Sequence, residues 1–88
     1  MGPYETEAEA LAEPLYAEVH ALHEPGRLDS AEVGLAVTSA TLAHLEAACA
    51  DAGVELGAHD RRILAWLAGY EASTVQVIIG LISRANRT

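Results

Sequence analysis

The chain has 88 residues, a hydrophobic content of 51% and a formal net charge of −8, with no lysine and no phenylalanine. This length supports one small hydrophobic core and is too short for two independent domains. A single cysteine, Cys49, excludes an intramolecular disulfide, and the acidic balance repels nucleic-acid phosphates over most of the surface.

The N-terminal residues 1–13 are acidic and lack both a basic lead and a long apolar run. We therefore expect no signal peptide and a cytoplasmic protein. The uncharged stretch 72–83 is shorter than the about 20 apolar residues that a bilayer span requires. We predict that residues 1–13 form either a loose lead or the first helical turns, and that residues 14–88 form a single helical domain.

Two features shape the predicted first helix. The sequence TEAE at residues 6–9 is a capping box, which predicts a helix start. Pro14 then removes a backbone hydrogen bond and predicts a break. We expect a helix over residues 6–23 with this break, followed by a turn at the sequence HEPGR, residues 23–27.

The predicted second helix, over residues 30–50, opens with a capping box at residues 29–32. It is apolar on two faces, which is typical of a central or a dimeric helix.

Gly53 and Gly57 separate this helix from a third, over residues 58–68. The sequence STVQ at residues 73–76 is a further capping box and predicts a fourth helix over residues 74–86. The predicted fold is therefore an all-α, compact bundle of four helices.

The segment from Arg61 to Gly80 resembles the helix-turn-helix module of bacterial and phage repressors. The small residue, the turn glycine and the two apolar residues of that family are matched here by Ala65, Gly69, Val75 and Ile78. The resemblance implies a DNA-binding regulator that uses residues 61–87. It would assign DNA contacts to Arg61, Arg62, Ser73, Gln76, Arg84 and Arg87.

The predicted fourth helix has an apolar outer face, whereas a recognition helix must present a polar face to the groove. Residues 72–83 carry no charge, and a monomer of this size has difficulty covering them all. We therefore favour a small, non-enzymatic protein-interaction or regulatory module that self-associates through this helix, most simply as a homodimer, over the DNA-binding alternative. The predicted interface residues are Trp66, Tyr70, Val77, Ile79, Leu81 and Ile82.

The acidic N-terminal part supports a third alternative, an inhibitor of a nucleic-acid-binding protein. In that case the glutamates would form one continuous face. They are Glu5, Glu7, Glu9, Glu13 and Glu18.

Residues 21–32 resemble a degenerate calcium-binding EF-hand loop. The turn glycine, apolar anchor, polar ligand and bidentate glutamate of that family are matched by Gly26, Leu28, Asp29 and Glu32. The earlier ligand positions hold residues that supply no suitable side-chain oxygen, Ala21, His23 and Pro25. A turn followed by a capped helix is the favoured interpretation.

Zinc-ligand residue types occur at His20, His23, His44 and Cys49, at a spacing that is common by chance. The chain has no phosphate-binding loop and no Ser/His/Asp arrangement. We expect no metal, no cofactor and no enzymatic activity.

The sequence DRRILAWLAGYEASTVQVIIGLISRA, at residues 60–85, resembles the ends of small uncharacterised proteins of actinobacteria and their phages. The resemblance implies a genomic context and no particular activity.

Overall fold

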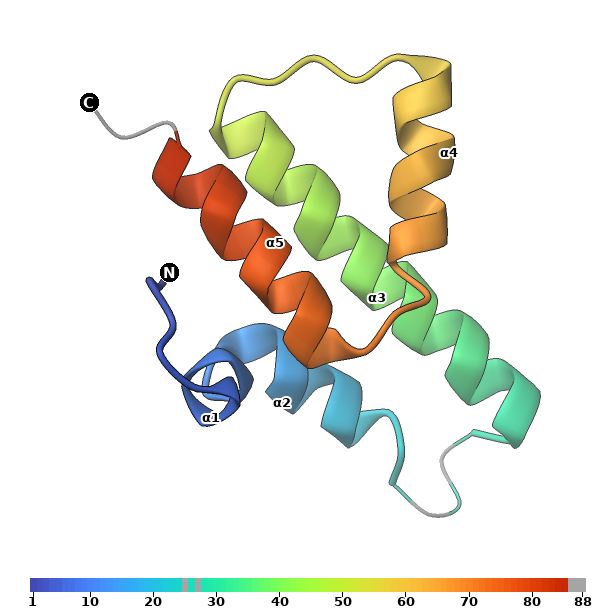
Figure 1. The fold of residues 1–88 in the computed structure, drawn as a ribbon. Coiled ribbons are helices and arrows are strands. Elements are labelled where there is room, and N and C mark those ends of the chain that lie inside the picture. Colours follow the sequence, from blue (N-terminus) through green and yellow to red (C-terminus); the bar gives the residue numbers. More distant parts are fainter. Residues whose placement is uncertain (25, 27, 86–88) are drawn as a thin grey trace.

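The computed structural model describes residues 1–24, 26 and 28–85, and every regular element in this part of the chain is a helix (Figure 1). The all-α class is therefore confirmed. The helix count is five rather than four, because Pro14 starts a helix of its own. The helices are α1 (Glu7–Leu11), α2 (Pro14–Ala21), α3 (Ser30–Asp51), α4 (Ala58–Leu67) and α5 (Ala72–Ala85).

The break between α1 and α2 follows from the chemistry of proline. Thr6 caps α1 by accepting a hydrogen bond from the Glu9 backbone N–H at 3.3 Å. Glu13 is extended, and Pro14 occupies the first position of α2. A residue at that position has no intrahelical partner for its N–H, so the missing donor of proline costs nothing there.

The long central helix α3 has the ends that the sequence predicts. The Asp29 carboxylate accepts a hydrogen bond from the Glu32 backbone N–H at 2.9 Å. At the other end Gly53 has φ +75°, and the Val54 N–H donates to the Cys49 carbonyl at 2.9 Å. This arrangement closes the last turn of the helix and requires a residue that tolerates a positive φ.

The start of α5 differs from the expectation. The helix begins at Ala72, and the Glu71 carbonyl accepts hydrogen bonds from the N–H groups of Thr74 and Val75, both at 3.0 Å. The prediction that Ser73 caps this helix is wrong, because Ser73 already lies in the first turn. The predicted end at residue 86 lies outside the described residues.

The core lies between α2, α3 and α5, with α4 packed on α3 at one side (Figure 1). The molecule is flat, with extents of 45 × 33 × 16 Å. None of the ten residues of α4 is buried. The buried core residues are Leu15, Val19, Leu45, Ala48, Ala68, Val75 and Ile79.

By length and composition alone, α3 is apolar enough to cross a membrane. The sequence-based expectation missed this property because it considered only the uncharged stretch 72–83. Within the molecule, 22% of the most apolar window of α3 is buried. Core helices of water-soluble proteins and signal sequences share this property, so it assigns no location by itself.

Candidate protein interface

Three apolar side chains form a continuous row on the outer side of α4 and the turn that follows it. Ile63 and Trp66 are three residues apart and share one side of α4, and Tyr70 follows in the turn, where its ring contacts that of Trp66. These three residues are here called the α4 strip. Their exposed fractions are 44%, 62% and 49%. Leu64 and Leu67 pack on the core from the neighbouring side of the helix. One apolar side of α4 is thus covered, and the other faces water.

The aromatic part of the α4 strip is internally ordered. The rings of Trp66 and Tyr70 lie with their centroids 5.0 Å apart and their planes at 85°, an edge-to-face contact. This geometry places the positive edge of one ring against the negative face of the other, which stabilises the pair beyond its contact area. The two side chains therefore form a preassembled aromatic pair at the surface.

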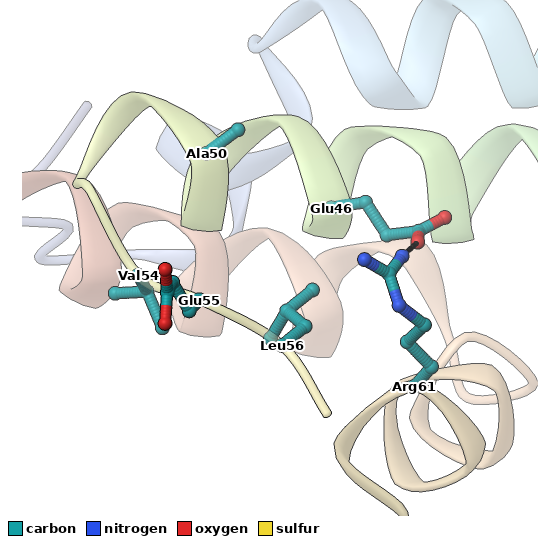
Figure 2. A pocket seen from close by; sticks show the side chains of 6 residues that line it. All are labelled: Glu46, Ala50, Val54, Glu55, Leu56 and Arg61. Atoms are coloured by element: carbon teal, nitrogen blue, oxygen red, sulfur yellow. Dashed lines mark hydrogen bonds and ion pairs between the residues drawn. The ribbon is translucent and has the colours of Figure 1, made fainter. Parts of the chain in front are cut away.

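An ion pair fixes the start of α4 on α3. Arg61 donates a hydrogen bond from Nη1 to the Glu46 carboxylate at 2.8 Å (Figure 2). The pair lies at one side of a hollow of about 510 Å³ between α3, the connecting segment and α4. Its lining residues are Glu46, Ala50, Val54, Glu55, Leu56 and Arg61. Because Arg61 is engaged in this pair, its guanidinium is not a free cation.

The charged residues at the two ends of the α4 strip differ from Arg61. Arg62 and Glu71 are both exposed. Among the described residues, neither has an ion-pair partner. Arg62 Nη2 nevertheless lies within hydrogen-bond distance of His59 Nδ1, at 3.4 Å. The strip is thus bounded by a cation that contacts a neighbouring side chain of α4 and by the exposed carboxylate of Glu71.

The predicted interface residues of α5 are divided between surface and core. Val77 and Leu81 are exposed and lie one turn apart. Ile79 is buried in the core cluster, so its predicted place on the interface is wrong. Ile82 is partly buried and packs on the same cluster. The division arises because α5 is apolar on most of its circumference, and one side of it must complete the core.

The N-terminal residues cover the polar side of α5. Gln76 is 2% exposed, and its Nε2 donates a hydrogen bond to the Tyr4 hydroxyl oxygen at 3.0 Å. Arg84 donates from Nη1 to the Met1 carbonyl oxygen at 2.6 Å, and its guanidinium lies 5.9 Å from the centroid of the Tyr4 ring. Sequence reasoning missed this contact, since no local pattern indicates that residues 1–4 return to α5.

The residues that the helix-turn-helix resemblance assigns to DNA do not share one open face in the described part of the chain. Gln76 is covered by Tyr4, Arg61 is paired with Glu46, and Arg84 holds Met1. Ser73 is half-buried and Arg62 is exposed. Arg87 lies outside the described residues.

The candidate zinc ligands are separate. His44 Nε2 lies 2.7 Å from a Glu18 carboxylate oxygen, and His23 Nδ1 lies 3.0 Å from the Val19 carbonyl oxygen. Cys49 is buried, and the His20 ring lies against that of Tyr16 at a tilt of 53°, with the centroids 5.9 Å apart. Within the described ranges, no group of three His, Cys, Asp or Glu side chains is placed to hold a metal ion.

The segment that resembles an EF-hand loop includes two residues outside the described part, Pro25 and Arg27. Of its other residues, Asp29 accepts the Glu32 backbone N–H and so caps α3. The N-terminal cap of α3 therefore accounts for the spacing of Asp29 and Glu32 without a bound cation.

No protein-family model, no curated protein and no solved structure matches the chain. The function must therefore follow from the geometry described above.

Proposed function

We propose that the chain is a small, non-enzymatic, cytoplasmic protein-interaction module whose contact surface is the α4 strip. The observation that carries the proposal is the exposure of Ile63 and Trp66 on α4, a helix with no fully buried residue, and of Tyr70 in the turn that follows it. Leu64 and Leu67 hold this helix on the core. Its outer side is available to another molecule.

The energetics of the α4 strip favour protein as the partner. Burial of apolar surface contributes about 25 cal/mol per Å², and tryptophan and tyrosine bury the largest areas of all side chains. Aromatic residues that keep one orientation lose little conformational entropy on binding, and they are enriched among the residues that dominate binding energy. The edge-to-face contact of Trp66 with Tyr70 meets this condition.

Two observations support a protein partner over DNA. Gln76, which the helix-turn-helix resemblance assigns to base recognition, is covered by Tyr4. The chain also carries a formal charge of −8, which opposes approach to a phosphate backbone. Two of the arginines that could offset this repulsion, Arg61 and Arg84, are already bound to Glu46 and to the Met1 carbonyl.

The proposal is tested with Trp66→Ser, compared with two matched variants. Tyr16→Ser removes an exposed aromatic residue from α2, and Leu81→Ser removes an exposed apolar residue from α5. We expect association with protein partners, including the chain itself, to be lost in Trp66→Ser and retained in Tyr16→Ser. Sedimentation velocity and affinity capture with each variant as bait measure the two kinds of association.

The Leu81→Ser variant distinguishes a contact surface on α4 from one on α5. If Leu81→Ser abolishes association while Trp66→Ser does not, the surface lies on α5, as the sequence alone predicted. If no association depends on any of the three side chains, the proposed function is wrong.

A further inference from the structure

Residues 1–4 lie along one side of α5 and are here called the N-terminal arm (Figure 1). Gln76 Nε2 donates a hydrogen bond to the Tyr4 hydroxyl oxygen at 3.0 Å, and Arg84 Nη1 donates to the Met1 carbonyl oxygen at 2.6 Å. The Arg84 guanidinium also lies 5.9 Å from the centroid of the Tyr4 ring. In these contacts α5 supplies the donor or the cation, and the arm supplies the acceptor or the ring.

The N-terminal arm is separate from the hydrophobic core. None of the residues 1–4 is fully buried, and none belongs to the core cluster. The helix α5 meets the core through Val75 and Ile79, whereas it meets the arm through Gln76, Gly80 and Arg84. Residues 76, 80 and 84 are spaced by four and therefore form a row of their own on the helix. Release of the arm thus leaves the packing of α5 on α2 and α3 intact.

The N-terminal arm ends where the capping of α1 begins. The Glu5 backbone N–H donates to the Glu9 carboxylate at 3.3 Å, and the Glu9 backbone N–H donates to Thr6 Oγ1 at 3.3 Å. Both bonds lie within residues 5–9, so they persist whether or not the arm contacts α5. A cavity of about 440 Å³ lies between residues 4–7 and the first two turns of α5. The junction between the arm and α1 therefore has room to move.

The contacts of the N-terminal arm are weak in comparison with the stability of a folded domain. A hydrogen bond or a cation–π contact favours the bound state by about three- to tenfold, so the three contacts hold the arm closed by about 30- to 1,000-fold. Burial of the Tyr4 ring adds to this factor, and the backbone freedom that the arm regains on opening opposes it. Small domains favour the folded over the unfolded state by about 10³- to 10⁸-fold. Opening of the arm is therefore easier than unfolding of the bundle.

We propose that the N-terminal arm is a hinged cover of α5, which opens at its junction with α1 while the helices remain folded. In the closed state Gln76 and Gly80 are buried. In the open state they and Arg84 become accessible beside Val77 and Leu81, which are exposed already. A ligand that contacts Gln76 must displace the arm, so its apparent dissociation constant is raised by the factor with which the arm is closed. The closed arm is thus an autoinhibitory contact on this side of α5, and it is independent of the α4 strip.

The test is native-state hydrogen exchange of the 88-residue chain, followed by NMR. The side-chain N–H of Gln76, the one glutamine of the chain, reports opening of the arm, and the backbone N–H of Leu45 reports unfolding of the bundle. We expect the Gln76 side chain to exchange about 30- to 1,000-fold more slowly than a free amide, and Leu45 to exchange more slowly still. Low concentrations of urea should accelerate exchange strongly at Leu45 and little at Gln76, because opening of the arm exposes little surface.

Tyr4→Ala and Tyr16→Ala are matched variants for the same measurement. We expect Tyr4→Ala to bring exchange of the Gln76 side chain to within about threefold of a free amide, because the acceptor and the ring are both lost. Protection of Leu45 should fall by no more than the factor lost at Gln76, since the arm stabilises the fold only through its closure. Tyr16→Ala, on the exposed side of α2, should change Gln76 protection by less than about threefold.

Three results would overturn the inference. If Gln76 and Leu45 of the wild type show equal protection and equal urea dependence, the arm leaves α5 only when the bundle unfolds. If the Gln76 side chain exchanges as fast as a free amide, the arm covers nothing. If circular dichroism shows that Tyr4→Ala is unfolded, the arm is an integral part of the bundle. None of these results affects the proposed function, which depends on Trp66 and is measured by association.

Discussion

The side-chain amide of Gln76 donates a hydrogen bond to the hydroxyl oxygen of Tyr4 at 3.0 Å, across 72 positions of the sequence. The bond satisfies a polar group that is almost fully buried on α5. Arg84 strengthens the same contact by holding the Met1 carbonyl. The first four residues are therefore part of the packing of α5 and not a separate tail.

This relationship predicts the effect of removing one hydroxyl group. We expect Tyr4→Phe to lower the free energy of unfolding by about 1 kcal/mol. A buried donor without a partner costs about 1–3 kcal/mol, and the Met1 sulfur, 3.4 Å from Gln76 Nε2, remains as a weak acceptor. Urea denaturation followed by circular dichroism measures the change.

The control for this experiment is Tyr16→Phe, which removes the same group from an exposed position on α2. Its effect should stay within about 0.5 kcal/mol, as is usual for surface positions. Equal losses in both variants would show that the hydroxyl of Tyr4 has no special role.

The packing of Tyr4 on α5 makes a second prediction at Gly80. A Cβ added there would lie 2.8 Å from the Tyr4 ring and 3.3 Å from the Met1 carbonyl oxygen. Glycine in a helix interior costs about 0.5–1 kcal/mol relative to alanine, so Gly34→Ala, which meets nothing within 4 Å, should stabilise α3 by that amount. Gly80→Ala should forfeit this gain, because Tyr4 must move away. Thermal or urea denaturation compares the two variants, and equal stabilisation in both would contradict the described packing.

The sequence predicts features whose cause lies within a few residues. Gly53 and Asp29 are examples, since a positive φ and an N-terminal cap depend on local backbone geometry alone. The capping pattern at residue 73 did not mark the helix start, because α5 already begins at Ala72. Its fourth residue, Gln76, donates to Tyr4, and a contact so distant in sequence leaves no local pattern.

The candidate interface shows the same limit. Periodicity identifies the apolar residues of α4 and α5, but both helices are apolar on more than one side. Which side is covered depends on tertiary packing. Ile79 is therefore in the core, whereas Ile63 is exposed. The spacing of Ile63, Trp66 and Tyr70 was the available signal for the α4 strip.

A third prediction concerns acid pH and the cap of α3. The hydrogen bond from the Glu32 backbone N–H to the carboxylate lowers the pKa of Asp29 from its ordinary value of 3.8. A lowered folded-state pKa stabilises the fold above the unfolded-state pKa, and this contribution is lost as the pH falls through the folded-state value. We expect the part of the unfolding free energy that depends on Asp29 to decrease below about pH 4.

Two variants separate the charge of Asp29 from its capping bond. Asparagine is as good a cap as aspartate but does not titrate, so Asp29→Asn should retain the cap and show a weaker acid dependence than the wild type. Asp29→Ala should be less stable than Asp29→Asn at neutral pH. Urea denaturation between about pH 2 and about pH 7 measures both. Identical acid profiles of wild type and Asp29→Asn would exclude Asp29 as a source of the acid dependence.

The last prediction tests which side of α3 is covered, using two leucines in the same helix. Leu45 is 0% exposed in the core, whereas Leu35 is 74% exposed. Leu45→Ala should lower the free energy of unfolding by about 2–5 kcal/mol, because it removes buried methyl groups and leaves a cavity. Leu35→Ala should change it by less than about 0.5 kcal/mol, since the side chain already contacts water and alanine favours the helix.

Both variants alter the helix propensity of α3 equally, so their difference reports burial alone. The measurement is made at low protein concentration and repeated at a higher one, because any self-association would add a concentration-dependent term to both values. A large loss at Leu35 under these conditions would mean that the outer side of α3 is covered, and the packing of the described fold would be wrong.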